Sequence, residues 1–97
     1  MPHLTDSAAP SARTRIREAV VNSFQEALEL RRLQARQELT ESTVLLESGL
    51  DSLGFAILIV KLEDTLGYDP FVLMSEPVYP KTFGEFLDVY ERYLPES

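Results

Sequence analysis

The chain contains no cysteine, only one histidine and no long hydrophobic run. Without cysteine there is no disulfide, thiolate metal site or thiol nucleophile, so any thiol chemistry must come from an attached group. The one histidine, His3, lies in a polar N-terminal segment and cannot build a metal site alone. The longest apolar run, Phe55 to Val60, is far too short to cross a bilayer. The N-terminal segment also lacks the apolar stretch of a signal peptide, so we expect a cytoplasmic protein without a membrane span.

Basic residues are scarce as well. The chain has 9 lysines and arginines against 16 aspartates and glutamates, which gives a net charge of −7. Such a surface repels nucleic-acid phosphates and favours partners with basic patches, so we expect no nucleic-acid partner. A length of 97 residues allows one domain with a modest core but hardly a deep catalytic cavity as well. We expect a disordered tail over residues 1–12 and one domain over residues 13–95.

Helical periodicity predicts an all-α fold. We expect a small four-helix bundle: three main helices, over residues 11–37, 52–66 and from 83 onward, and a short third helix ending near residue 74. A long loop over residues 38–51 separates the first two helices. The first and last helices each show one apolar stripe, formed by Ile16, Val20, Phe24, Ala27 and Leu28 and by Phe83, Phe86, Leu87, Tyr90 and Leu94.

Capping residues support these bounds. Gly67 is suited to end the second helix, and Asp69 followed by Pro70 is typical of the start of the short one. Thr82 and Glu85 fit a capping box for the last helix.

Two further groups of residues belong to the first helix and the loop. Arginines gather in and around the first helix, where we interpret them as a solvated face in preference to a basic patch for a partner: Arg13, Arg15, Arg17, Arg31, Arg32 and Arg36. Four aliphatic residues predict that the loop packs over the bundle: Val44, Leu45, Leu46 and Leu50.

The second helix has two apolar faces, whereas packing within one bundle requires only one stripe. One face carries Phe55, Leu58, Ile59, Leu62 and Leu66, and the other carries Leu53, Ala56, Ile57 and Val60. The second face is buried inside the domain, forms a homodimer seam, or is an exposed docking surface beside Ser52. We favour the docking surface, because it accounts for the serine and the stripe together.

Ser52 stands directly before this helix, where a serine is most often a plain N-cap. Asp51 can fill that role instead, which leaves the Ser52 hydroxyl free near the positive end of the helix dipole, a position that suits an attached phosphodiester. No histidine is near in sequence and no Gly-x-Ser-x-Gly elbow is present, so the sequence gives no support to a serine hydrolase. The pair Glu63-Asp64 diverges on a helix and is no catalytic dyad. We therefore expect no catalytic residues and no enzyme activity: Ser52 is a substrate for another enzyme.

The chain resembles the acyl and peptidyl carrier protein family from about residue 15 to 94. The likeness rests on the segment Thr43-Val44-Leu45-Leu46-Glu47, the motif Gly49-Leu50-Asp51-Ser52-Leu53, the leucines at 58, 62 and 66, and Pro80-Lys81-Thr82-Phe83. The resemblance implies that a phosphopantetheinyl transferase uses coenzyme A and magnesium to attach 4′-phosphopantetheine to the Ser52 oxygen, making a phosphoprotein. It also implies that the arm's thiol holds cargo as a thioester and that Asp51 orients the serine region. The second helix would dock on synthase enzymes through Leu53, Ala56, Ile57, Val60 and Asp64.

One departure bears on the cargo. Fatty-acid carriers usually show acidic residues on the exposed face of this helix, whereas here that face is apolar and acids come only at Glu63 and Asp64. The chain is therefore more similar to peptidyl or D-alanyl carriers, or to specialised acyl carriers, than to a housekeeping fatty-acid carrier, and this departure suggests a dedicated partner with an apolar groove. We expect a free-standing, monomeric acyl carrier of a specialised lipid, polyketide or related biosynthetic pathway, served by an activating ligase and downstream synthases or transferases. The alternatives are an aminoacyl, peptidyl or D-alanyl carrier and, more remotely, a non-carrier helical interaction module.

Overall fold

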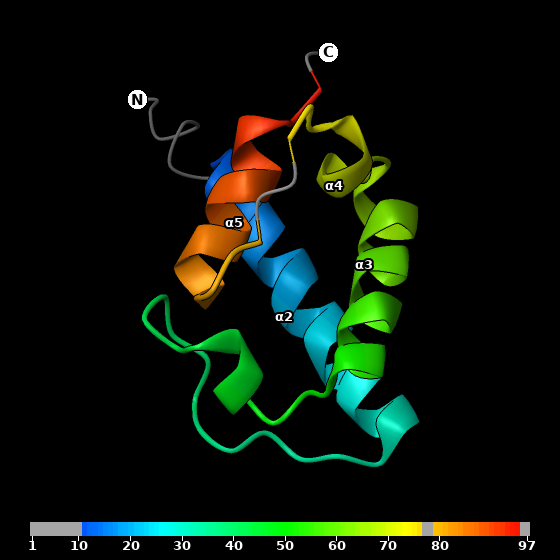
Figure 1. Ribbon diagram of the computed structural model, residues 1–97, viewed down its shortest axis with the longest axis vertical. Coiled ribbons are helices and arrows are strands. Elements are labelled where there is room, and N and C mark those ends of the chain that lie inside the picture. Colours follow the sequence, from blue (N-terminus) through cyan, green and yellow to red (C-terminus); the bar gives the residue numbers. More distant parts are fainter. Residues whose placement is uncertain (1–10, 77–78, 96–97) are drawn as a thin grey trace, which may run out of the picture.

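The computed structural model describes residues 11–76 and 79–95. Within them the predicted all-α class is confirmed: α2 (Ala12–Arg31), the 3-10 helix η1 (Leu45–Glu47), α3 (Ser52–Leu66), α4 (Pro70–Leu73) and α5 (Phe83–Arg92) follow in this order. Figure 1 shows α2 behind α3 and α5. The short α4 lies at the C-terminal end of α3, and the long connection between α2 and α3 crosses the opposite end of the molecule. Most of the predicted tail, with His3, lies outside the described residues. Its last two positions, Ser11 and Ala12, are the N-cap and first residue of α2.

Side-chain and glycine caps define the ends of the later helices, as predicted. The Asp51 carboxylate accepts the Gly54 N–H at 2.8 Å at the start of α3, and Gly67 ends the helix in the left-handed region with φ 89°. Asp69 caps α4, with Pro70 at the first turn. Thr82 and Glu85 form the expected capping box of α5.

The end of α2 differs from the prediction. The helix stops at Arg31, not at residue 37, because Arg32 adopts a left-handed conformation with φ 56°. The N–H groups of Arg32 and Leu33 then bond back to the carbonyls of Glu29 at 3.1 Å and Leu28 at 2.8 Å, as in a glycine-ended helix. Leu33 packs against the core and holds this turn. The long loop therefore begins six residues earlier than expected.

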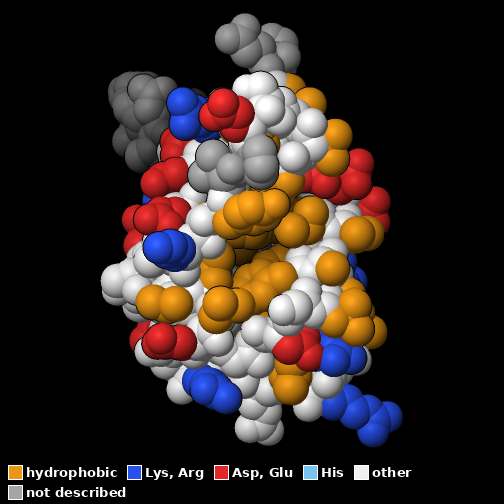
Figure 2. Space-filling view, viewed as in Figure 1, with side chains coloured by type: hydrophobic (Ala, Val, Ile, Leu, Met, Phe, Trp, Pro, Cys, Tyr) orange, Lys and Arg blue, Asp and Glu red, His pale blue; other side chains and the backbone are white. Residues whose placement is uncertain are grey.

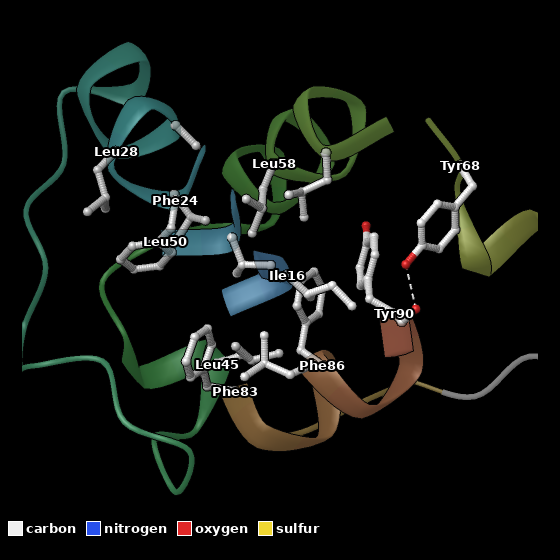
Figure 3. Close-up of a cluster of buried hydrophobic side chains, with 14 residues drawn as sticks. Ile16, Phe24, Leu28, Leu45, Leu50, Leu58, Tyr68, Phe83, Phe86 and Tyr90 are labelled. Carbon is white, nitrogen blue, oxygen red and sulfur yellow. Dashed lines mark hydrogen bonds between the residues drawn. The ribbon is translucent and has the colours of Figure 1, made fainter. Parts of the chain in front are cut away.

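The core lies between α2, α3 and α5 (Figure 3). It includes four of the five stripe residues predicted in the last helix; Leu94 is 38% exposed, because α5 already ends at Arg92. The Tyr68 hydroxyl donates to the Tyr90 carbonyl at 2.5 Å and ties the connection between α3 and α4 to α5. No helix in the described ranges combines the length and apolar character needed to span a bilayer. The buried apolar residues are Ile16, Val20, Phe24, Ala27, Leu28, Leu45, Leu50, Leu58, Leu62, Tyr68, Phe83, Phe86, Leu87, Val89 and Tyr90.

The long loop is fastened to the start of α5. The Leu45 N–H donates to the Lys81 carbonyl, and the Phe83 N–H donates to the Thr43 carbonyl, both at 2.9 Å. Two of the four predicted aliphatic anchors, Leu45 and Leu50, are buried; the other two, Val44 and Leu46, are exposed.

An ion cluster fastens the same loop to α2 and α5. Arg13 contacts Asp88 at 2.6 Å, Glu91 at 2.9 Å and Glu41 of the loop at 3.0 Å, and Arg17 contacts Glu41 at 2.7 Å. Part of the arginine-rich face therefore lies in ion pairs between elements and is not simply solvated.

Candidate functional site

Ser52 is the first residue of α3 and is exposed. The Asp51 carboxylate, not the Ser52 hydroxyl, accepts the capping hydrogen bond from the Gly54 N–H. This is the arrangement expected from the sequence, and it leaves the hydroxyl available to an external reagent at the positive end of a helix.

Two glycines shape the backbone around this serine. Gly49 has φ 110°, and a Cβ there would lie 2.4 Å from the Gln34 carbonyl oxygen. A Cβ at Gly54 would lie 2.4 Å from the Leu50 Cδ1 atom and 3.0 Å from an Asp51 carboxylate oxygen. The missing side chains therefore allow the loop to close against itself and allow Leu50 and Asp51 to pack against the first turn of α3.

An ion pair joins Asp51 to Arg31 at the end of α2. The Arg31 Nη2 atom lies 2.6 Å from the Asp51 Oδ2 atom, and Nε lies 3.2 Å from each carboxylate oxygen. Hydrogen bonding from Arg31, followed by the Gly54 N–H, lowers the pKa of the Asp51 carboxyl below its usual value. Asp51 is therefore ionised at neutral pH and held in place. The sequence reading missed Arg31 as a site residue, because a pair across a loop has no local pattern.

The second apolar face of α3 is largely exposed. Leu53 and Val60 are 55% and 59% exposed, and Ala56 and Asp64 are exposed as well. Ile57 differs, because it is half-buried and packs against the core. The expected surface thus presents two large apolar side chains along α3, Leu53 beside Ser52 and Val60 about two turns away, with Ile57 at the edge of the surface.

An apolar groove of about 770 Å³ opens beside Ser52. Figure 2 shows the groove as a hollow surrounded by hydrophobic side chains, in the middle of the face of the molecule that is in view. Apart from Ser52, only Lys81 among its lining residues is neither apolar nor aromatic. Sequence reasoning missed the groove, because its walls come from η1, α3, α4, α5 and the segment that leads into α5. It is lined by Val44, Leu45, Leu46, Ser52, Phe55, Ala56, Ile59, Phe71, Tyr79, Pro80, Lys81 and Phe86.

A family model for the phosphopantetheine attachment site, PP-binding, matches residues 18–72. The match covers more than half of the 97-residue chain and includes α3 with Ser52. No curated protein and no solved structure matches the chain. In the described ranges no group of three or more acidic or histidine side chains could hold a metal ion.

Domains of this family carry covalent 4′-phosphopantetheine and interact with phosphopantetheinyl transferases and biosynthetic enzymes. An exposed serine hydroxyl at the edge of an open groove fits a covalently attached flexible arm. The chain belongs to the phosphopantetheine attachment-site family and is a phosphopantetheine carrier protein.

Proposed function

We propose that Ser52 bears the 4′-phosphopantetheine arm and that the chain carries acyl groups for a specialised lipid, polyketide or related biosynthetic pathway. The observation that carries this proposal is the exposed Ser52 hydroxyl beside an apolar groove. The attached arm supplies a terminal thiol that holds cargo as a thioester.

The chain's own residues present the hydroxyl and leave its activation to the transferase. Asp51 caps α3 and fixes the backbone at Ser52. The chain has one histidine, His3, which is far from Ser52 in the sequence, so no local Ser-His motif marks Ser52 as a nucleophile of its own enzyme. The chain thus acts as a substrate and carrier, not as an enzyme.

The groove supports acyl cargo over aminoacyl cargo. Each buried methylene group contributes about 0.8 kcal/mol when it leaves water. An aminoacyl group brings a charged amine, which is costly to bury without a partner. The walls of the groove offer no carboxylate to pair with such an amine.

The exposed face of α3 supports docking of partner enzymes. Leu53 adjoins the modification site and Val60 lies about two turns further along α3, and exposed apolar side chains grouped on one helix face are typical of interaction surfaces. We propose that the transferase, an acyl-activating ligase and downstream synthases contact this face, with Ala56 and Asp64 contributing. The chain then acts as a cytoplasmic monomer whose tethered cargo reaches each enzyme at a high effective concentration.

The attachment is tested by intact mass after incubation with coenzyme A, magnesium and a promiscuous phosphopantetheinyl transferase. We expect the wild type to gain the mass of one phosphopantetheine group and Ser52→Ala to gain nothing. Ser42→Ala, which removes an exposed serine from the loop, serves as the matched control and retains the gain. A folded wild type that stays unmodified, or a Ser52→Ala protein that is modified, contradicts the proposal.

The cargo is tested by thermal unfolding of the octanoyl- and alanyl-loaded forms. We expect the octanoyl form to unfold at a higher temperature than the alanyl form, because its chain buries apolar surface. Leu46→Ser removes an exposed groove residue and should reduce this difference. Leu30→Ser, which removes an exposed leucine of α2 that does not line the groove, should not. Equal unfolding temperatures for the two wild-type forms would favour an aminoacyl carrier.

A further inference from the structure

The Asp51 carboxylate lies one residue before the attachment site and carries a full negative charge. Both of its oxygens are engaged by Arg31, and one also accepts the Gly54 N–H. A phosphodiester on Ser52 places a second negative charge next to this carboxylate, on a chain whose net charge is already −7. Like charges so close repel each other unless a cation lies beside them.

Arg31 is that cation. Its guanidinium is held by three contacts to Asp51, and about a third of its side chain is exposed. The Arg31 side chain belongs to the last residue of α2, so its position is fixed by a helix that packs along α3. Because a guanidinium stays charged at any working pH, this compensation is permanent.

We propose that Arg31 is a positioning residue for the prosthetic arm: it holds Asp51 in its capping position and cancels its charge, so that the start of α3 accepts a phosphodiester on Ser52. This inference rests on the proposed attachment at Ser52. The simpler possibility is that the ion pair only fastens α2 to α3, with no bearing on the arm.

The two possibilities predict different effects of the variants on the stability change that the arm causes. If the pair is only a fastener, removing either partner weakens the fold equally in the unmodified and the modified protein. If Arg31 balances charge, removing it makes attachment of the arm more destabilising. Removing the charge of Asp51 then has the opposite effect, because the freed Arg31 faces the phosphodiester alone.

The experiment measures the unfolding temperature of the unmodified and the fully modified protein at low salt. The variants are Arg31→Gln, Arg31→Lys and Asp51→Asn, which keeps a side-chain cap. Arg15→Gln is the matched control, since Arg15 is an exposed arginine of the same helix. The quantity compared is the change in unfolding temperature caused by the arm.

For Arg31→Gln we expect attachment of the arm to change the unfolding temperature about 3 °C less favourably than in the wild type. This size follows from the typical strength of an exposed charge pair in a domain of this length. Arg31→Lys should resemble the wild type, Asp51→Asn should shift the change in the favourable direction, and 1 M salt should remove the differences. Equal changes in Arg31→Gln and Arg15→Gln, or the same sign for Arg31→Gln and Asp51→Asn, overturn the inference. If the wild type takes up no arm at all, the failure lies with the proposed attachment site instead.

Discussion

Replacing Gly49 with alanine should disrupt the turn that presents Ser52. Gly49 has φ 110°, a conformation that costs an L-residue about 1–2 kcal/mol. The added Cβ would also lie 2.4 Å from the Gln34 carbonyl oxygen, so the two parts of the loop must separate. Forced overpacking of this kind costs about 1–3 kcal/mol more. A smaller term of about 0.4–1 kcal/mol acts in the other direction, because alanine restricts the unfolded chain.

Gly67→Ala is the matched control. Gly67 has φ 89°, but a Cβ there would meet no atom within 4 Å. Gly67→Ala therefore incurs only the conformational cost. From the middle of the ranges above, we expect the unfolding temperature to fall by about 3–6 °C for Gly67→Ala and by about 10–20 °C for Gly49→Ala. The assay is thermal unfolding followed by circular dichroism. If Gly49→Ala is no more destabilising than Gly67→Ala, the close approach of the loop to Gly49 is wrong.

Three further predictions concern the cap, the exposed face and the core. Because Arg31 lowers the pKa of the Asp51 carboxyl, the stability that Asp51 adds should be complete above about pH 4 and should be lost as acid protonates the carboxylate. The difference in unfolding temperature between the wild type and Asp51→Asn should therefore shrink below about pH 4. A difference that stays constant with pH would contradict this. Val60→Glu should keep the fold but weaken docking, measured as a raised KM with the transferase, whereas Leu30→Glu should leave KM unchanged; loss of folding in Val60→Glu would place that residue in the core. Tyr68→Phe should lower the free energy of unfolding, measured with urea, by about 1–3 kcal/mol, because the buried Tyr90 carbonyl loses its hydrogen-bond donor. An unchanged free energy of unfolding would show that this hydrogen bond does not stabilise the fold.

The helix bounds set by side-chain caps were predictable from sequence. Asp51 and Gly67 delimit α3, and Thr82 with Glu85 starts α5, because each cap is a local hydrogen-bonding pattern within a few residues. The end of α2 was not predictable in this way. Arg32 takes up the left-handed conformation because Leu33 packs on the core, which is a tertiary effect without a glycine signal.

In the candidate site, too, local features were predictable from the sequence and contacts between distant segments were not. Ser52 and its cap follow from a short motif, so their positions were expected. The Arg31–Asp51 pair and the groove join segments far apart in the chain, and sequence periodicity does not register such contacts. The half-burial of Ile57 has a related cause. Helical periodicity assigns a residue to a face of the helix, but the neighbouring elements determine how much of that face they cover.

The most direct measurement of the central claim is localisation of the arm by tandem mass spectrometry. Trypsin cleavage after Arg36 and Lys61 releases one peptide that contains Ser42, Ser48 and Ser52 together. Fragmentation of this peptide from the modified protein should place the whole added mass on Ser52. An added mass on either of the other two serines, or a peptide that stays unmodified after full incubation, would contradict the account.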